Sequence, residues 1–288
     1  KSATAIPSSL NSAKIMLSPL LSAQYDHTRS YYSSAVTEID SHKVRVHAIH
    51  PSATSLNSAF TLKSKLSLMN WGFLSEAKES IENEYLAIGL ISGTIQIYSP
   101  FSNELLTELI APDNSAVVDF HYSKLSQTAW SCDISGNICE WNIQLFSLVQ
   151  KFNLSDVLQL YNEEESQEIP TKISTTLQGG KLCLLVATQS VYLINAESKA
   201  LLTKFPAHVQ PIHSLISLPI VEENGSHDGK FLTAANGDRF VNLYSVSSPT
   251  AAQIYVTQSP VVSLSFGGDN SGKPCVLAAI NEDGAVEI

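Results

Sequence analysis

Short runs of apolar residues alternate along the whole chain with clusters of Gly, Asn, Asp and Ser. Val, Ile, Leu, Tyr and Phe dominate these runs, and helical periodicity is nearly absent. Short apolar runs bounded by turn-forming residues are typical of many strands joined by tight turns. The pattern therefore predicts an all-β fold.

One unit recurs along the chain: a strand of small residues, a polar turn with Gly or Asp, then an alternating strand that ends near an aromatic residue. The copies cover residues 85–99, 128–142, 184–195, 231–245 and 276–288, with a weaker copy at 33–49. Successive copies lie roughly 43 to 54 residues apart, close to the period of a four-stranded propeller blade. We expect a single β-propeller domain over residues 1–288.

Further apolar runs complete the units. LSLMNWGF, AVVDFHY, PIHSLISL and PVVSLSF precede four copies, and LLTEL, LVQKF and LLTKF follow three. Six units are visible, and the last ends at Ile288, so we expect a seven-bladed ring with one blade incomplete in this chain. Because an open ring exposes sheet edges, closure is expected to use residues beyond 288, a strand candidate around Ile15 to Gln24, or both. Longer insertions are expected at about 50–65, 74–83, 160–171 and 220–229.

The composition supports one compact body, with 44% apolar and 15% charged residues. A net charge of -10 argues against a surface built mainly to neutralise phosphates, although it leaves room for a local basic patch. Candidates for such a patch on one rim are Lys43 and Arg45 with Lys63 and Lys65. No stretch approaches the roughly 18 apolar residues that a membrane span requires, so no membrane association is expected.

The sequence offers little chemistry for catalysis or cofactor binding. Its four cysteines form no Cys-x-x-Cys pair, so neither a metal site nor a disulfide scaffold is expected. The stretch GGDNSGKP (267–274) resembles a phosphate-binding loop, but Pro274 replaces the Ser or Thr that holds the metal, and a surface hairpin is favoured. No nucleophile elbow occurs, and no convergent cluster of titratable groups can be assembled for a central channel. We therefore expect no enzyme, no cofactor, no metal and no small-molecule substrate.

The repeated units resemble WD repeats, which carry a Gly-His pair, a Ser or Thr on the second strand, an Asp in the following turn and a closing Trp-Asp. The fifth unit matches best, with Ala207–His208, Thr233, Asp238 and Tyr244–Ser245. Other units are more degenerate and offer Ser92 with Tyr98, Ser135 with Trp141–Asn142, and Thr188 with Ile194–Asn195.

His208, Thr233 and Asp238 resemble a catalytic triad by residue type alone. The WD resemblance implies another role, a structural network with Tyr244 in which the Asp carboxylate accepts from the imidazole and the imidazole reaches the strand hydroxyl. Arg239 stands where a WD repeat usually has a small residue, and we consider it a candidate for contact with RNA or a partner.

The order of the degenerate units gives a narrower resemblance. GLISGTIQIYSPFSNELL, EWNIQLFSLVQKF, LLVATQSVYLIN, KFPAHVQPIHSL and FLTAANGDRFVNLYSV together resemble the N-terminal propeller of a fungal nucleolar family, a subunit of the UtpA (t-UTP) subcomplex of the small-subunit processome. Members of that family continue into a C-terminal helical assembly region, which these residues lack.

The resemblance implies a non-enzymatic scaffold in the nucleolus of the nucleus. Such a scaffold acts in early ribosome biogenesis, in processing of pre-18S rRNA and its coupling to transcription, as part of the U3 ribonucleoprotein machinery. The implied partners are other UtpA subunits and the 5′ external transcribed spacer of pre-rRNA, directly or through those subunits. Two alternatives stay open: a propeller that binds the spacer RNA directly, and a WD-repeat adaptor of another complex.

Overall fold

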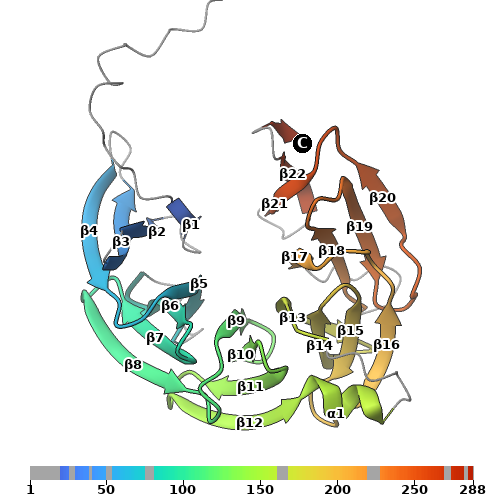
Figure 1. Cartoon of the computed structure of the whole chain (residues 1–288), viewed down its shortest axis with the longest axis horizontal. Helices are drawn as coiled ribbons and strands as arrows, with labels where there is room; N and C mark the ends of the chain where they lie inside the picture. The colour runs from blue at the N-terminus through green and yellow to red at the C-terminus, as the bar shows by residue number, and fades with distance from the viewer. Residues whose placement is uncertain are drawn as a thin grey trace, which may run out of the picture.

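The computed structural model describes residues 20–25, 30–38, 41–49, 54–74, 81–160, 168–218, 228–268, 274–281 and 285–287. Within these ranges the chain forms six antiparallel sheets, five with four strands and the last with three. The sheets stand side by side along an arc, like the blades of a propeller (Figure 1). The predicted all-β, WD-repeat-like architecture is confirmed, whereas the seven-bladed count stays a prediction.

The first three sheets are formed by consecutive strands. The first contains β1 (Leu20–Tyr25), β2 (Tyr31–Glu38), β3 (Ser41–Ile49) and β4 (Thr54–Thr61). The second contains β5 (Leu66–Phe73), β6 (Glu84–Leu90), β7 (Thr94–Ser99) and β8 (Glu104–Ile110), with the 3-10 helix η2 (Ile81–Asn83) before β6. The third contains β9 (Val117–Ser123), β10 (Thr128–Asp133), β11 (Asn137–Asn142) and β12 (Ser147–Asn153).

The other three sheets repeat the same order. The fourth follows a short helix α1 (Leu154–Gln159) and contains β13 (Lys172–Gln178), β14 (Lys181–Ala187), β15 (Val191–Asn195) and β16 (Leu201–Phe205). The fifth contains β17 (Ile212–Ser217), β18 (Lys230–Ala235), β19 (Phe240–Ser245) and β20 (Gln253–Val256). The sixth contains β21 (Val261–Gly268), β22 (Pro274–Asn281) and β23 (Val286–Glu287).

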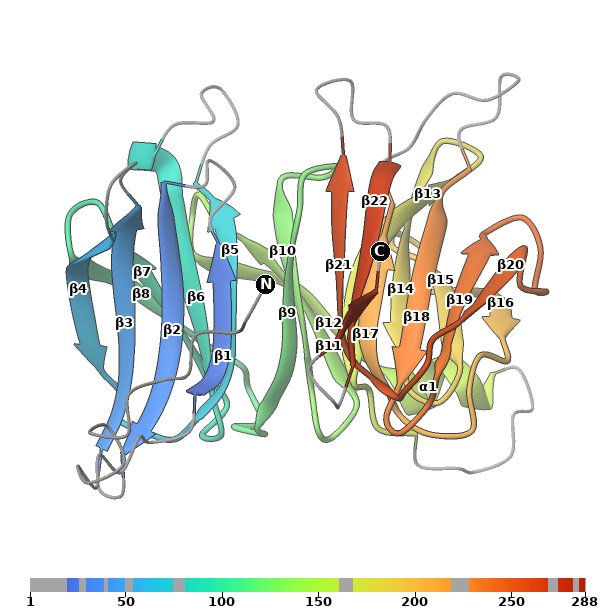
Figure 2. The ribbon, with the colours of Figure 1, turned by 90° about the horizontal axis from the view of Figure 1, so that it is seen from above.

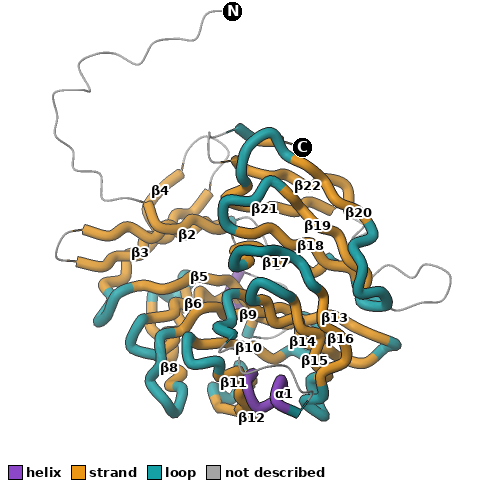
Figure 3. The backbone as a smooth tube through the Cα atoms, turned by 45° about the vertical axis from the view of Figure 1, so that its right-hand side comes forward, coloured by secondary structure: helices purple, strands orange, loops and turns teal. Residues whose placement is uncertain are grey.

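Each sheet is a meander that runs from the inside of the arc to its rim. The first strand of each sheet lies on the inner side, and β4, β8, β12, β16 and β20 lie at the outer edge (Figures 1 and 3). Seen from above, neighbouring sheets stand face to face like upright plates (Figure 2). Connecting loops therefore gather at the two ends of the strands, where rigid sheets hold them in fixed positions.

The hydrophobic core is divided into layers between adjacent sheets. The layer between the second and third sheets, for example, joins Phe73 and Tyr85 to Phe120 and Trp141, all of them buried. Four similar clusters fill the other contacts between neighbouring sheets. Strands buried on both faces, such as β6 and β14, explain the continuous apolar runs in the sequence.

The repeat is visible in the strand register as well as in the sequence. In the second, third and fourth sheets the pairing of the last two strands shifts at the same place, next to Tyr98, Trp141 and Ile194. These are the residues that the WD comparison places at the closing Trp position. A β-bulge at this point bends the outer strand, so the three sheets curve alike.

Two expectations about the chain's organisation need correction, and one element was not expected. The insertion expected at about 50–65 contains β4, the outer strand of the first sheet. The strand candidate around Ile15 to Gln24 does contain a strand, β1, but β1 pairs with β2 as the inner strand of the first sheet and not with the last described sheet. Helix α1 was not predicted, because six residues are too few for a helical period to show. Residues 15–19 and the centres of the other three insertions lie outside the described residues.

The stretch that resembles a phosphate loop connects β21 and β22, which pair antiparallel with Gly268 opposite Pro274. Its residues 269–273 lie outside the described part. Within the described ranges, no helix combines the length and the apolar character needed to cross a bilayer. The same ranges contain no group of three or more His, Cys, Asp or Glu placed to hold a metal ion.

Candidate functional site

The inner strands surround a cavity of about 590 Å³, which is lined by residues from each of the six sheets. Five titratable side chains contribute to its wall: Lys65, Asp119, His121, Lys172 and His213. The expectation that no titratable groups converge on a central channel was therefore wrong. These residues come from four sheets: Lys65 precedes β5, Asp119 and His121 lie on β9, Lys172 lies on β13 and His213 lies on β17. Only the arrangement of the sheets along the arc brings them to one cavity.

Most of these groups are engaged in contacts between neighbouring sheets. Asp119 on β9 accepts from the backbone N–H of Ile173 (2.9 Å) and pairs with Lys172 on β13 (3.3 Å). This pairing, together with burial that acts in the opposite direction, leaves the pKa of Lys172 raised. His121 lies 3.0 Å from the Thr175 hydroxyl of the fourth sheet. The cavity wall thus ties the third sheet to the fourth by charge and hydrogen bonds.

His213 joins the fifth sheet to the sixth. Its Nε2 lies 2.8 Å from the carbonyl oxygen of Val261, and its Nδ1 lies 2.8 Å from the Ser214 hydroxyl. A carbonyl only accepts, so Nε2 carries the proton and Nδ1 accepts from the hydroxyl in a neutral ring. Burial, assisted by the nearby Lys172 charge, lowers the pKa of His213 despite the opposing bond to Val261.

The lowered pKa of His213 predicts a loss of stability in acid. A His with a folded pKa below its ordinary value of 6.5 contributes fully above that pH, and the contribution is lost as pH falls through the folded pKa. We expect the free energy of unfolding to fall between pH 7.5 and 5.5, and to fall less in His213→Gln. Urea unfolding at both pH values measures this difference. His47, whose pKa burial also lowers, should leave a residual slope in the variant, whereas an unchanged slope would contradict the assignment.

The structure brings His208, Thr233 and Asp238 together. His208 lies between β16 and β17, and its Nδ1 is 2.8 Å from Asp238 Oδ2 in the turn between β18 and β19. Its Nε2 is 3.0 Å from the Thr233 hydroxyl on β18. Gly237, with φ +66°, permits the turn that presents Asp238, whose N–H bonds back to Ala235. The imidazole therefore links a loop, a strand and a turn.

These distances match a hydroxyl–imidazole–carboxylate triad, but the burial does not suit catalysis. Thr233 has 0% of its surface exposed, and the His208 side chain has 1%. A substrate carbonyl must approach the nucleophilic oxygen to within about 3 Å, which this burial prevents. The three residues are therefore placed to hold the fold, and we propose that this is their role.

Tyr244, the fourth residue expected in the network, lies apart from the imidazole. Its hydroxyl donates to the Pro206 carbonyl (3.2 Å), and its ring packs on Phe205 and Phe231. Burial raises the pKa of its hydroxyl. The tyrosine thus anchors the loop before β17 at a second point, Pro206, two residues before His208.

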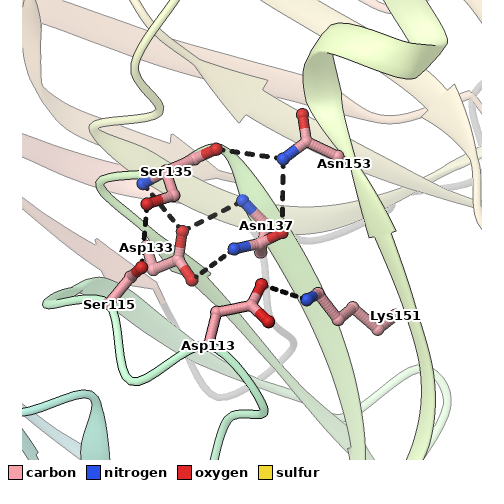
Figure 4. Close-up of polar contacts among 7 residues, drawn as sticks. All are labelled: Asp113, Ser115, Asp133, Ser135, Asn137, Lys151 and Asn153. Carbon is pink, nitrogen blue, oxygen red and sulfur yellow. Dashed lines mark hydrogen bonds and ion pairs between the residues drawn. The ribbon is translucent and has the colours of Figure 1, made fainter.

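The third sheet fixes its corresponding turn with a different set of residues (Figure 4). The buried Asp133 carboxylate accepts from the N–H of Ser135 and from both the N–H and the amide of Asn137, at 2.9 to 3.0 Å. Asn153 of β12 donates to Ser135 and Asn137 from the neighbouring strand. Asp133, two residues before Ser135, thus supplies the carboxylate that fixes this turn, although the WD comparison assigns the turn position to Ser135.

Trp141 supplies the third sheet's link between strands. Its indole Nε1 donates to the Ser131 hydroxyl at 2.8 Å, and both residues are buried. Ser131 corresponds to Thr233, since Ala129 pairs with Trp141 as Phe231 pairs with Tyr244. The strand hydroxyl is thus satisfied by an indole in one sheet and by an imidazole in another.

The four basic candidates do not share one environment. Lys43 and Arg45 lie on one face of β3, opposite the buried Val44 and Val46 that pack on the second sheet. Lys63 pairs with Glu108 of β8 at 3.1 Å. Lys65 lines the central cavity instead.

The Lys63–Glu108 pair is exposed and should contribute little to stability. The Lys63 side chain is 76% exposed, and Glu108 also accepts from Gln96 (2.8 Å); bonds to Gln96 and Lys63 lower the Glu108 pKa. We expect Lys63→Met to change the free energy of unfolding by less than about 1 kcal/mol. Urea unfolding at pH 7 measures this change, and a loss of several kcal/mol would contradict the description.

Arg239 is exposed and follows Asp238 at the end of the turn before β19. Its guanidinium reaches the Gln258 carbonyl at 3.5 Å, and no ion pair joins it to another described residue. The structure thus separates the two charged neighbours, because Asp238 contacts His208 whereas Arg239 reaches Gln258 between β20 and β21.

No protein-family model matches this chain. It is 26% identical over 283 residues to "U3 small nucleolar RNA-associated protein 5" of Saccharomyces cerevisiae, across 95% of this chain and 40% of that protein. It is 28% identical over 221 residues to human "WD repeat-containing protein 43", across 73% of this chain and 31% of that protein.

A third relative carries the same U3 description. The "U3 small nucleolar RNA-associated protein 5" of Schizosaccharomyces pombe is 22% identical over 285 residues, across 92% of this chain and 40% of that protein. The two U3-associated relatives match nearly the whole length of this chain, and the human relative matches about three quarters of it. It spans at most about two fifths of the length of the curated relatives it matches.

Proposed function

We propose that this chain is the propeller part of a non-enzymatic scaffold that acts in ribosome biogenesis in the nucleolus. The observation that carries the proposal is the similarity over 95% of the chain to a protein named for its association with U3 small nucleolar RNA. The fold supports it physically: sheets with cores on their shared faces hold many loops in place, so a partner is bound with little loss of conformational entropy.

The finer form of the proposal concerns the assembly. We infer that the chain works within the UtpA subcomplex of the small-subunit processome, contacts other subunits through loops and rim strands, and reaches the 5′ external transcribed spacer through them. Its role is in pre-18S rRNA processing and its coupling to transcription. We further propose a single propeller domain, closed by a seventh sheet, and a helical assembly region in the full-length protein.

Purification of the full-length protein tests the proposal. We expect the tagged protein to recover U3 small nucleolar RNA and processome proteins far above the level recovered by an equally abundant nuclear WD-repeat protein from another complex. RNase treatment should leave the contacts with protein subunits intact. Recovery of a different complex without U3 RNA would reject the proposal.

Direct binding of single-stranded RNA is a second candidate, favoured by one face of the first sheet. Lys43, Arg45 and His47 alternate along this face of β3, and His47 stacks on Tyr32 with ring centroids 4.7 Å apart. Basic side chains beside stacked rings are the usual elements of single-stranded nucleic-acid surfaces. A seventh sheet placed next to the first would cover the same face.

Crosslinking separates these two uses of the face. If RNA binds here, ultraviolet crosslinks to pre-rRNA should map to residues 31–65, and Arg45→Glu in the full-length protein should weaken them while Lys199→Glu does not. Binding should also weaken steeply as salt rises. Crosslinks that are absent from this region, or unaffected by Arg45→Glu, would reject direct binding while leaving the scaffold proposal in place.

A further inference from the structure

The outer edge of the fifth sheet differs from the other rims. β20 is the last strand of its sheet, and all four of its residues are exposed. Ile254 is 56% exposed, Val256 is 60% exposed, and Phe240 on the neighbouring strand is 44% exposed. Figures 1 and 3 show β20 at the periphery, where no described element covers its free side.

Other rim strands carry charges that discourage pairing with a further strand. β8 contains two glutamates, β12 contains Lys151 and β16 contains Lys204. By contrast, no charged residue occurs from Phe240 to Gly268. β4 also lacks a charge, but its large exposed apolar residues are limited to Leu56 among those described. Native proteins commonly protect sheet edges with charged side chains, so an apolar, uncharged edge marks a site for strand pairing.

The strand register tells which backbone groups are available. The N–H of Thr257 donates to the carbonyl of Arg239 (2.9 Å). In antiparallel pairs successive residues point alternately toward and away from the partner strand. Tyr255 therefore points its backbone groups toward β19, whereas Ile254 and Val256 point theirs to the open side. An extended polypeptide is the ligand that satisfies such alternating N–H and carbonyl groups.

Side chains define the partner more closely. Phe240 is opposite Val256 in the register, and Ile254 follows on the same face, so three apolar side chains line one side of the edge. Arg239 lies at the end of the strand pair and makes no ion pair with a described residue. A complementary strand carries apolar residues at alternate positions and a carboxylate near Arg239.

We propose that the β20 edge docks an extended segment of another protein subunit, which adds a fifth strand to the fifth sheet. This inference rests on the proposed function, since it names the kind of partner that the scaffold binds. Main-chain hydrogen bonds from Ile254 and Val256 supply the affinity, and the apolar row with Arg239 supplies the specificity.

Hydrogen exchange tests the strand addition directly. The full-length protein is measured alone and within purified U3-containing particles. We expect the amides of Ile254 and Val256 to exchange at least about tenfold slower in the particle, because an added strand accepts their hydrogen bonds. Equal exchange in both states would overturn the proposal, even where U3 RNA is recovered and the scaffold function stands.

A pair of variants isolates the backbone contribution. Val256→Pro removes the outward N–H without disturbing the bonds to β19, whereas Val256→Thr keeps the N–H and the branched shape. We expect Val256→Pro, but not Val256→Thr, to abolish the added amide protection at Ile254, with unchanged thermal stability for both. Retained protection in Val256→Pro would contradict strand addition. Mutual recovery of two differently tagged copies, lost in Val256→Pro, would assign the edge to self-association and overturn the heteromeric partner.

Discussion

Trp141→Ala is expected to lower the free energy of unfolding by about 3 to 5 kcal/mol. The indole is buried between the second and third sheets, where it packs in the same cluster as Phe73, Tyr85 and Phe120. Its removal leaves a cavity in this layer and also strands the Ser131 hydroxyl, which accepts from Nε1. Urea unfolding of the wild type and the variant measures the loss.

Trp141→Phe is the matched control, because it keeps most of the ring packing and removes the indole N–H. We expect this variant to lose about 1 to 2 kcal/mol, mainly through the unsatisfied Ser131 hydroxyl. Equal losses for the two variants would show that packing contributes little at this position. If neither variant lowered the free energy of unfolding by more than a surface substitution does, the described packing between the two sheets would be contradicted.

His208→Ala is expected to lower the free energy of unfolding by about 1 to 3 kcal/mol. The variant leaves the fully buried Thr233 hydroxyl without its imidazole partner and frees the turn that Asp238 holds. The loss should be accompanied by faster proteolysis of the loop that contains His208, since its link to β18 is gone.

A double-mutant cycle with Thr233→Val gives the control. Thr233→Val preserves the shape of the side chain and removes the hydroxyl, so the two changes should be less than additive by about 0.5 to 3 kcal/mol. Strict additivity would contradict a shared network. A variant that remains folded is also expected to keep its cellular function, because these residues are placed to hold the fold and not to catalyse a reaction.

Much of the fold was predictable because propeller sheets obey local rules. The strand pairs of the repeated unit emerged from alternation and turn residues, and runs such as LSLMNWGF match β5. The outer strands β4 and β20 were not identified, because TSLNSAFT is polar and QIYV is only four residues long. A rim strand pairs on one side only, so its sequence is less constrained than that of a buried strand.

The contacts at the centre were less accessible from sequence. His208, Thr233 and Asp238 were found because a repeat pattern assigns their positions, although Tyr244 bonds elsewhere. The pairing of Asp119 with Lys172, and of His213 with Val261, joins residues about 50 positions apart on strands of different sheets. No local pattern encodes such contacts, because they depend on the angle at which adjacent sheets meet.

The central claim is that this propeller docks proteins within a U3-containing assembly. Lysine crosslinking and mass spectrometry of particles purified through tagged U3-associated proteins test it most directly, with the full-length protein present. The account predicts crosslinks from lysines on loops and rims, such as Lys124, Lys151 and Lys199, to at least one other protein subunit. Particles that contain the protein but give no crosslink from residues 20–287 to another subunit would contradict the account.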